Sequence, residues 1–373
     1  MIGLVLLTSL SLGAPPSAEA QATLEAGGCT LCHSVPGVTA APREASCHTC
    51  HTWIRAVASD PAKRARAMQI FPKWERYEHT VASYMQVPSL EAARARLEPS
   101  WVSHWLADPH DVRPALSEGM PRFDLDDEQR ESIAEWLAAG QATVAETPPP
   151  STERIDAGRA LYAQKGCPAC HTFGAQTAAA PNPMAPDLAV TRHRMTPDRV
   201  AAWIQDPQQV SSAATMPAMG VSAEEAVAIR DYLLLSDPGG RTAAPLGPAP
   251  EPVQTPVTWA DVESRVFGKI CVHCHMKPAL NQGRAGPGNA GGFGWDATGI
   301  ELQTYEGVAA AADLIPDALL RRRLEAHRDV IAPGEKPAEV LRPTKPGMPL
   351  GLPPLPDEDI ALVLGWLQQG MPR

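Results

Sequence analysis

The pattern of apolar positions along the chain predicts three amphipathic helices, at residues 126–139, 222–236 and 356–369. Within each segment apolar residues recur three or four positions apart, which places them on one face of a helix. That face includes a large aromatic residue in every case, namely Trp136, Tyr232 and Trp366. Acidic residues at the start of the first and third segments favour the positive end of a helix dipole. The pattern predicts an all-α fold.

The same order of features precedes each of these helices. A cysteine motif comes first, then a loop-rich stretch, then a Met-Pro pair, and the helix closes the unit. The Met-Pro pairs are Met120-Pro121, Met216-Pro217 and Met348-Pro349. The first two units also share a Trp-to-Pro sequence, at residues 105–109 and 203–207. This repetition predicts one helical fold used three times.

Two proline-rich stretches separate the three units. They cover residues 146–151 and 237–258 and contain many of the 39 prolines. Segments of this kind behave as extended, semi-rigid spacers. The predicted domains are therefore residues 21–146, 153–236 and 258–373, and a length of 373 residues suits two or three domains.

The candidate chemistry lies in a five-residue motif, Cys-x-x-Cys-His, that occurs four times. The motif is the attachment sequence for c-type haem: two thiols bond to the porphyrin, and the histidine ligates the iron. The four copies use all 8 cysteines, which disfavours disulfides, zinc sites and redox dithiols. We expect four covalently bound haem c groups with four proximal histidines. The motif residues are Cys29, Cys32, His33; Cys47, Cys50, His51; Cys167, Cys170, His171; and Cys271, Cys274, His275.

Each unit resembles a class I cytochrome c domain. The resemblance rests on the motif, the Met-bearing loop and the closing helix, and it is fullest in the middle unit, where residues 155–162 lead into the motif. Gly158 and Tyr232 match the family's glycine–aromatic helix crossing. The first unit departs by carrying two motifs. The third departs by a glycine-rich insertion at 283–299 and by an arginine-rich helix at 321–323, which we expect to be a solvated face, with a haem propionate as the alternative partner.

A methionine thioether opposite the proximal histidine makes a six-coordinate iron and raises its reduction potential. Met216 and Met348 are the expected sixth ligands of the middle and third haems, with Met219 as an alternative to Met216. Met120 is expected to serve one of the two haems in the first unit, although the sequence does not say which. His79 is the candidate for the other haem, which otherwise has an open position.

The N-terminal sequence predicts an export signal. An apolar run at residues 2–12 is followed by Ala18-Glu19-Ala20, which predicts a signal peptide of residues 1–20 cleaved after Ala20. The run is too short to span a bilayer, and no other stretch approaches the length that a membrane helix needs. Haem c is attached outside the cytoplasm, so we expect a periplasmic protein. The formal net charge of −10 disfavours nucleic acid and favours a docking partner with a basic patch.

These features predict an electron carrier that relays electrons between periplasmic or membrane-bound redox proteins. The alternative is a haem enzyme of the peroxidase, nitrogen-oxide or sulfur-oxidising type, or its electron-entry subunit, with an open haem in the first unit. A redox or gas sensor is a third interpretation, disfavoured because no signalling domain is attached. Coordination separates the first two: a carrier has every iron six-coordinate, whereas an enzyme has one open or displaceable position.

Overall fold

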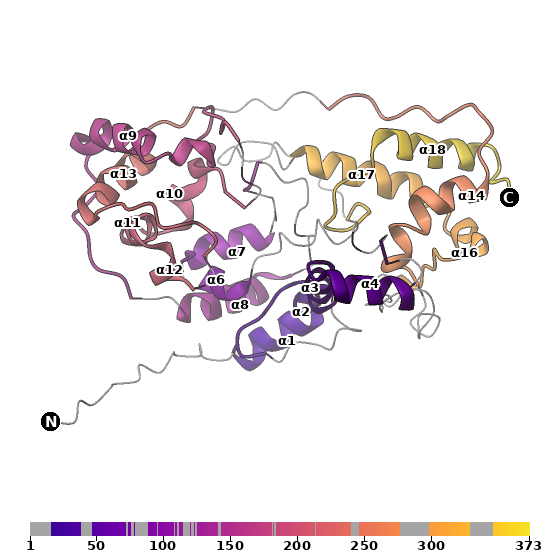
Figure 1. Cartoon of the computed structure of the whole chain (residues 1–373), viewed down its shortest axis with the longest axis horizontal. Coiled ribbons are helices and arrows are strands. Elements are labelled where there is room, and N and C mark those ends of the chain that lie inside the picture. The colour runs from indigo at the N-terminus through magenta and orange to yellow at the C-terminus, as the bar shows by residue number, and fades with distance from the viewer. Residues whose placement is uncertain are drawn as a thin grey trace.

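The computed structural model confirms the all-α class: its described residues form helices and loops, with one isolated β-bridge between Phe173 and Gln176 and no strand (Figure 1). None of the helices in this described part is long and apolar enough to cross a membrane. The described residues are 16–38, 47–71, 74–75, 78, 89–94, 96–107, 109, 112–114, 120, 123, 125–140, 143–180, 182, 184–212, 214–239, 246–276, 298–328 and 346–373.

The first unit has two separate cores. Its helices are α1 (Ala18–Ala26), α2 (Cys29–Cys32), α3 (Cys47–Ala58), α4 (Pro61–Ile70), α6 (Leu90–Arg94), α7 (Pro99–Ala107) and α8 (Asp127–Ala139). Helices α1 and α7 pack on α8 around Leu24, Val102 and Trp136. Helices α3 and α4 form a hairpin with its own small core, made of Cys50, Ile54, Val57, Ala67 and Trp74. We call α3, α4 and the residues through Glu78 the hairpin.

The middle unit is organised by the crossing of α9 on α13. Its elements are the 3₁₀ turns Thr152–Arg154, Cys167–Ala169 and Leu188–Val190 and the helices α9 (Ile155–Gln164), α10 (Thr191–Arg194), α11 (Pro197–Gln205), α12 (Pro207–Val210) and α13 (Ala223–Leu235). A Cβ atom on Gly158 would lie 2.0 Å from the carbonyl oxygen of Ala228 and 2.9 Å from the Cβ of Tyr232. Only glycine lets the two helices approach this closely, as the resemblance led us to expect.

The third unit repeats this crossing with aromatic side chains. Its elements are α14 (Trp259–Val262), a π-helical turn (Glu263–Phe267), a 3₁₀ turn (Cys271–His273), α16 (Tyr305–Ala310), α17 (Ile315–Arg328) and α18 (Asp357–Gln368). Trp366 of α18 is fully buried and lies 5.7 Å from Trp259 and 6.1 Å from Phe267, measured between ring centroids. These contacts join the first and last helices of the unit.

The three closing helices begin where local sequence chemistry predicts. Asp126 and Gln129 form a capping box at the start of α8, and Ser222 and Glu225 form another at the start of α13. Each box satisfies backbone N–H groups that the first helical turn leaves unpaired. Helix α18 begins after Pro356 with three acidic residues in its first turn.

The proline-rich stretches were expected to be extended, semi-rigid spacers outside the packed units, but parts of both pack along a closing helix. Residues 143–150 have no helix, but the fully buried Arg230 of α13 donates to the Thr147 hydroxyl at 2.6 Å and to the Pro148 carbonyl at 2.9 Å. In the third unit, Val253 donates to the Ala361 carbonyl of α18 at 3.1 Å. Proline-rich backbone still offers carbonyl acceptors, which a neighbouring helix can bind.

Helix α1 begins close to the expected signal-peptide cleavage site. Ser17 caps the helix by accepting from the Ala20 N–H, and Ala20 is fully buried in the core of the first unit. The cleavage position after Ala20 stays a prediction, and N-terminal sequencing of the exported protein would determine whether this first turn is retained.

Candidate haem sites

Three of the four motifs follow the first helix of their unit. Helix α2 holds Cys29 and Cys32 directly after α1, and the other two motifs begin with 3₁₀ turns after α9 and after the π-helical turn. Each short turn breaks near the histidine, which separates the motif from the preceding helix. The motif at Cys47 instead forms the first turn of α3, so that His51 lies inside a continuous helix. Helices α2 and α3 are in contact, which brings the first two motifs side by side.

The expected proximal histidines of the middle and third units are oriented by backbone carbonyls. His171 Nδ1 lies 2.9 Å from the Pro186 carbonyl oxygen, and His275 Nδ1 lies 3.0 Å from the Ile300 carbonyl oxygen. A carbonyl only accepts, so Nδ1 carries the proton and Nε2 keeps its lone pair for a metal. Burial lowers the pKa of both histidines, which favours the neutral, ligating form. This arrangement fits an iron porphyrin bound at the neighbouring cysteines.

The cysteine thiols do not have the properties of redox dithiols. Burial raises the pKa of Cys29 to about 11 and that of Cys271 to about 12, and it also raises the pKa of Cys167. Reactive cysteines have lowered pKa values. Across the described ranges, no three His, Cys, Asp or Glu side chains converge as a metal site would require. Thioether attachment to a porphyrin fits these paired, mostly half-buried thiols.

The candidate methionines lie in three different settings. Met120 is half-buried and packs against the core of the first unit. Met216 is half-buried, and its carbonyl accepts from the Gln208 side chain at 2.6 Å, while Met219 is 37% exposed. Met348 is half-buried, and its backbone N–H donates to the Ala318 carbonyl of α17. His79 lies outside the described residues, so it stays a candidate.

The first and middle units are joined by reciprocal arginine–tryptophan contacts. The Arg96 guanidinium lies 4.6 Å from the ring centroid of Trp203, and that of Arg194 lies 4.8 Å from Trp101. Glu98 accepts from Arg199 at 3.3 Å and donates its N–H to the Arg194 carbonyl at 2.8 Å. Cation–π contacts of this kind are stabilising when the cation is desolvated. Burial, with a smaller effect from Arg113, lowers the pKa of Arg96 to about 10.

The two arginines occupy equivalent positions in the two repeats, because Arg96 precedes Trp105 by the same number of residues as Arg194 precedes Trp203. The two tryptophans are not equivalent: Trp203 begins the repeated Trp-to-Pro sequence, whereas Trp101 lies before the copy of that sequence in the first unit. The repetition visible in the sequence therefore did not indicate these contacts.

The arginine-rich helix of the third unit was wrongly expected to be a solvated face. Arg322 of α17 is only 4% exposed and donates through Nε to the Leu352 carbonyl at 2.7 Å. Arg323 pairs with Asp357 at the start of α18 and donates to the Gly247 carbonyl at 3.0 Å. Arg322 therefore contacts the loop that carries Met348, and Arg323 contacts the second proline-rich stretch. Helical periodicity alone does not indicate such contacts.

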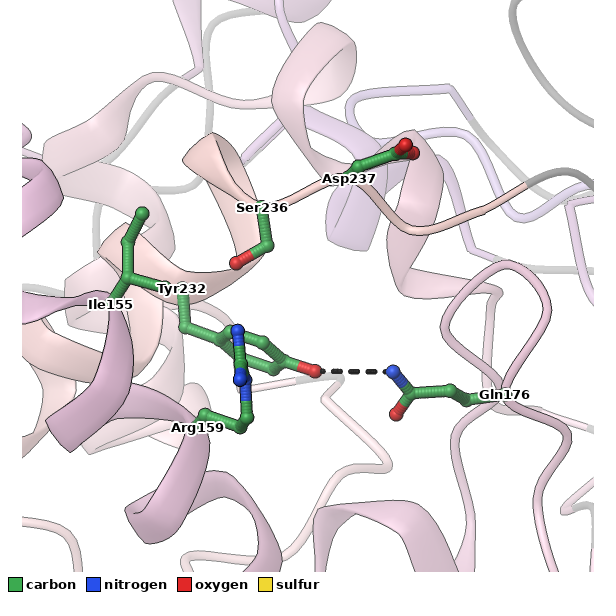
Figure 2. Close-up of a pocket in the computed structure, with 6 residues that line it drawn as sticks. All are labelled: Ile155, Arg159, Gln176, Tyr232, Ser236 and Asp237. Carbon is green, nitrogen blue, oxygen red and sulfur yellow. Dashed lines mark hydrogen bonds between the residues drawn. The ribbon is translucent and has the colours of Figure 1, made fainter.

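A pocket of about 440 Å³ in the middle unit lies away from the motif. Figure 2 shows Arg159 beside the Tyr232 ring and Gln176 directed at the Tyr232 hydroxyl, which accepts a long hydrogen bond of 3.5 Å. The remaining lining residues are Ile155, Ser236 and Asp237. No cysteine or histidine lines this pocket.

The comparisons with known proteins bear on the middle unit. Residues 153–233 match the family model described as "Cytochrome C oxidase, cbb3-type, subunit III". No curated protein and no solved structure matches the chain. The matched residues include the Cys167 motif, the oriented His171, Met216 and the Gly158–Tyr232 crossing. Residues 153–233 are similar throughout to a c-type cytochrome domain, the kind of domain that carries covalent haem c and transfers electrons.

Proposed function

We propose that the chain is a tetrahaem c-type cytochrome that relays electrons between redox partners in the periplasm. The observation that carries the proposal is the His171 imidazole, fixed by the Pro186 carbonyl with Nε2 available to iron, directly after the Cys167–Cys170 pair. His275 has the equivalent partner in the third unit. The first unit contributes two further motifs, so that four haems would be held on one chain.

The axial ligands would set the role of each haem. We assign Met216 and Met348 as sixth ligands in the middle and third units and Met120 to one haem of the first unit. His79 is the proposed sixth ligand of the remaining haem. Methionine ligation favours ferrous iron and a higher potential than bis-histidine ligation, so the chain would hold haems of unequal potential.

Electron relay requires haems at short, fixed separations. The contact between α2 and α3 supports close placement of the first two haems. The reciprocal arginine–tryptophan contacts support a fixed relation between the first and middle units. The chain's contribution is then to position the haems and to exclude water from them, while the haem supplies the one-electron chemistry.

Partners would be soluble or membrane-bound redox proteins of the periplasm. The apolar N-terminal run supports export, and haem c attachment outside the cytoplasm is consistent with it. The net charge of −10, made more negative by haem propionates, favours partners that present a basic surface.

The test is the visible spectrum of the dithionite-reduced, full-length protein before and after carbon monoxide, with haem and protein mass quantified on the same sample. We expect four covalently bound haems and an unchanged spectrum, because carbon monoxide needs an open or displaceable iron position. Fewer than four haems would contradict the tetrahaem assignment. Replacing both Cys167 and Cys170 by Ala should remove one haem from the mass and leave three.

The same measurement separates the carrier from the enzyme alternative. If one haem of the four binds carbon monoxide, a displaceable site exists, and peroxide, nitrogen oxides and sulfur compounds become the substrates to test. The His79→Ala variant then decides whether this histidine protects the site, because it should increase carbon monoxide binding only if His79 is a ligand.

A further inference from the structure

The loop that carries Met348 is tied directly to helix α17. The Met348 backbone N–H donates to the Ala318 carbonyl at 2.9 Å, and the Gly347 N–H donates to the Glu325 carboxylate at 2.8 Å. The two donors, Gly347 and Met348, are adjacent in the loop, and each lies more than twenty residues after its acceptor in α17. The backbone at Met348 is therefore held from one side by a single helix.

Arg322 of the same helix binds the loop at a residue that follows Met348 in the sequence. Its Nε donates to the Leu352 carbonyl at 2.7 Å, and its Nη1 lies 3.5 Å from the Glu325 carboxylate that binds Gly347. Arg322 is 4% exposed and the Glu325 side chain is 26% exposed, so the guanidinium is buried and the carboxylate is partly buried. This arginine–glutamate pair thus binds the loop before and after the methionine.

Gly347 shows how closely the loop approaches the helix. A Cβ atom built there would lie 2.1 Å from the backbone nitrogen of Arg322 and 2.4 Å from its Cα. Helix backbone cannot move aside as a flexible side chain can, so any larger residue would push the loop off α17. The close approach is independent of the Arg322–Glu325 contact and supports the same conclusion.

The corresponding loop of the middle unit is held more weakly. The Met216 carbonyl accepts from Gln208 through an exposed hydrogen bond of 2.6 Å, and the residues from Pro217 to Gly220 are exposed. At the end of the loop, Lys165 donates to the Gly220 carbonyl at 2.9 Å. Neither of these two bonds involves a buried arginine.

We propose that Arg322 and Glu325 are positioning residues that hold Met348 on its iron, and that, of the Met216 and Met348 sites, an external ligand therefore displaces Met216 first. The inference rests on the proposed methionine ligation. A loop already fixed in its bound conformation loses little freedom on ligation, so its methionine competes better with an incoming ligand. Of these two sites, the middle unit then holds the more exchangeable methionine.

The test is an imidazole titration of the ferric full-length protein, followed by the charge-transfer band of methionine-ligated haem. Proton spectra of the reduced protein assign each site, because a methionine methyl bound to ferrous haem is strongly shifted. Met348→Ala and Met216→Ala identify the two methyl signals, and the ferric titration of each variant assigns the displacement midpoint that disappears to its site. In the unmodified protein, we expect the Met216 site to be displaced at lower imidazole than the Met348 site.

Arg322→Gln and Gly347→Ala should lower the imidazole midpoint of the Met348 site about tenfold and leave the Met216 site unchanged. The matched control is Arg321→Gln on the same helix, whose guanidinium pairs with the exposed Asp317, and it should shift neither midpoint. Gly347→Ala keeps the Arg322–Glu325 pair, so it tests the same loop even if Arg322→Gln folds poorly.

The outcomes separate this inference from the proposed function. If Met348→Ala removes no shifted methyl signal, the proposed ligand is wrong. If that signal is lost but Arg322→Gln and Gly347→Ala move the midpoint by less than about twofold, the ligand stands and the positioning role is overturned. Displacement at the Met348 site before the Met216 site in the unmodified protein would overturn it equally.

Discussion

The middle unit and the hairpin of the first unit hold the same five-residue motif in different ways. In the middle unit, a core cluster of twelve buried residues includes side chains of α9 and α13, the two helices that cross. Among its described residues, the hairpin has a core cluster of five buried residues. Small cores rarely stabilise a fold without a further constraint. If the hairpin binds the proposed haem, that haem would complete its small core, whereas the middle unit is already organised around its candidate site.

The local conformation of the motif differs as well. His171 follows a 3₁₀ turn and finds its backbone partner at Pro186, far along the chain. His51 lies within α3, where the helix itself sets the direction of the side chain. The motif therefore determines the chemistry of attachment but not the backbone that presents it. The hairpin is the part of the chain where the class I resemblance gives the least guidance.

The largest expected effect comes from removing the centre of the hairpin core. Trp74 is 1% exposed, lies 5.5 Å from Trp53 and stacks on Phe71 at 6.0 Å. Trp74→Ala should destabilise the hairpin by about 3–5 kcal/mol, because the cavity cannot collapse around so few neighbours. Hydrogen exchange followed by mass spectrometry should show lost protection in α3 and α4, with α9 and α13 unchanged.

Met68→Ala is the control for that experiment, since Met68 lies on the same hairpin but is 40% exposed. It should alter protection little. Loss of protection in the middle unit along with the hairpin would contradict the separation of the two cores.

The reverse experiment addresses the middle unit. Gly158→Ala places a Cβ atom 2.0 Å from the Ala228 carbonyl oxygen, so α9 and α13 must separate. Overpacking against backbone should cost about 3 kcal/mol and lower the protection of both helices. The neighbouring Ala157 is exposed, and Ala157→Ser should have little effect. If Gly158→Ala is also neutral, the close helix crossing does not exist in solution.

The sequence predicted those features that depend on neighbouring residues. The closing helix of the middle unit was expected at 222–236, and the structure places its caps at Ser222 and Ser236, because capping chemistry and periodicity are local. The burial of Arg230 and Arg322 was not predictable in this way. Both bind backbone carbonyls of distant segments, and an arginine that will meet a carbonyl has the same local pattern as one that will face water.

The candidate haem sites also combine features that the sequence shows with features that only the fold supplies. The cysteines and histidines are contiguous in the chain, so the motif is visible in the sequence. The carbonyls of Pro186 and Ile300, which orient two of the histidines, have no side-chain pattern that would single them out. Backbone acceptors are supplied by the fold, and they become visible only when the loop after the motif is placed.

The smallest expected effect is a pH dependence confined to the hairpin. Glu78 accepts from Arg64 at 2.8 Å and from the Trp74 indole. Burial raises the pKa of Glu78, but the hydrogen bonds from Arg64 and Trp74 outweigh it, and the pKa lies below its ordinary value. A lowered pKa means that the ion pair stabilises the folded hairpin above about pH 4.3, the ordinary value for glutamate, and that this contribution is lost as the pH falls through the folded pKa. The contribution should be on the order of 1 kcal/mol, because the pair is partly exposed.

Exchange protection factors of α3 and α4, measured from about pH 6 to about pH 3 and corrected for intrinsic rates, should fall in the unmodified protein and stay flat in Glu78→Gln. An equal fall in both proteins would assign the acid sensitivity to another group and remove Glu78 from the forces that hold the hairpin.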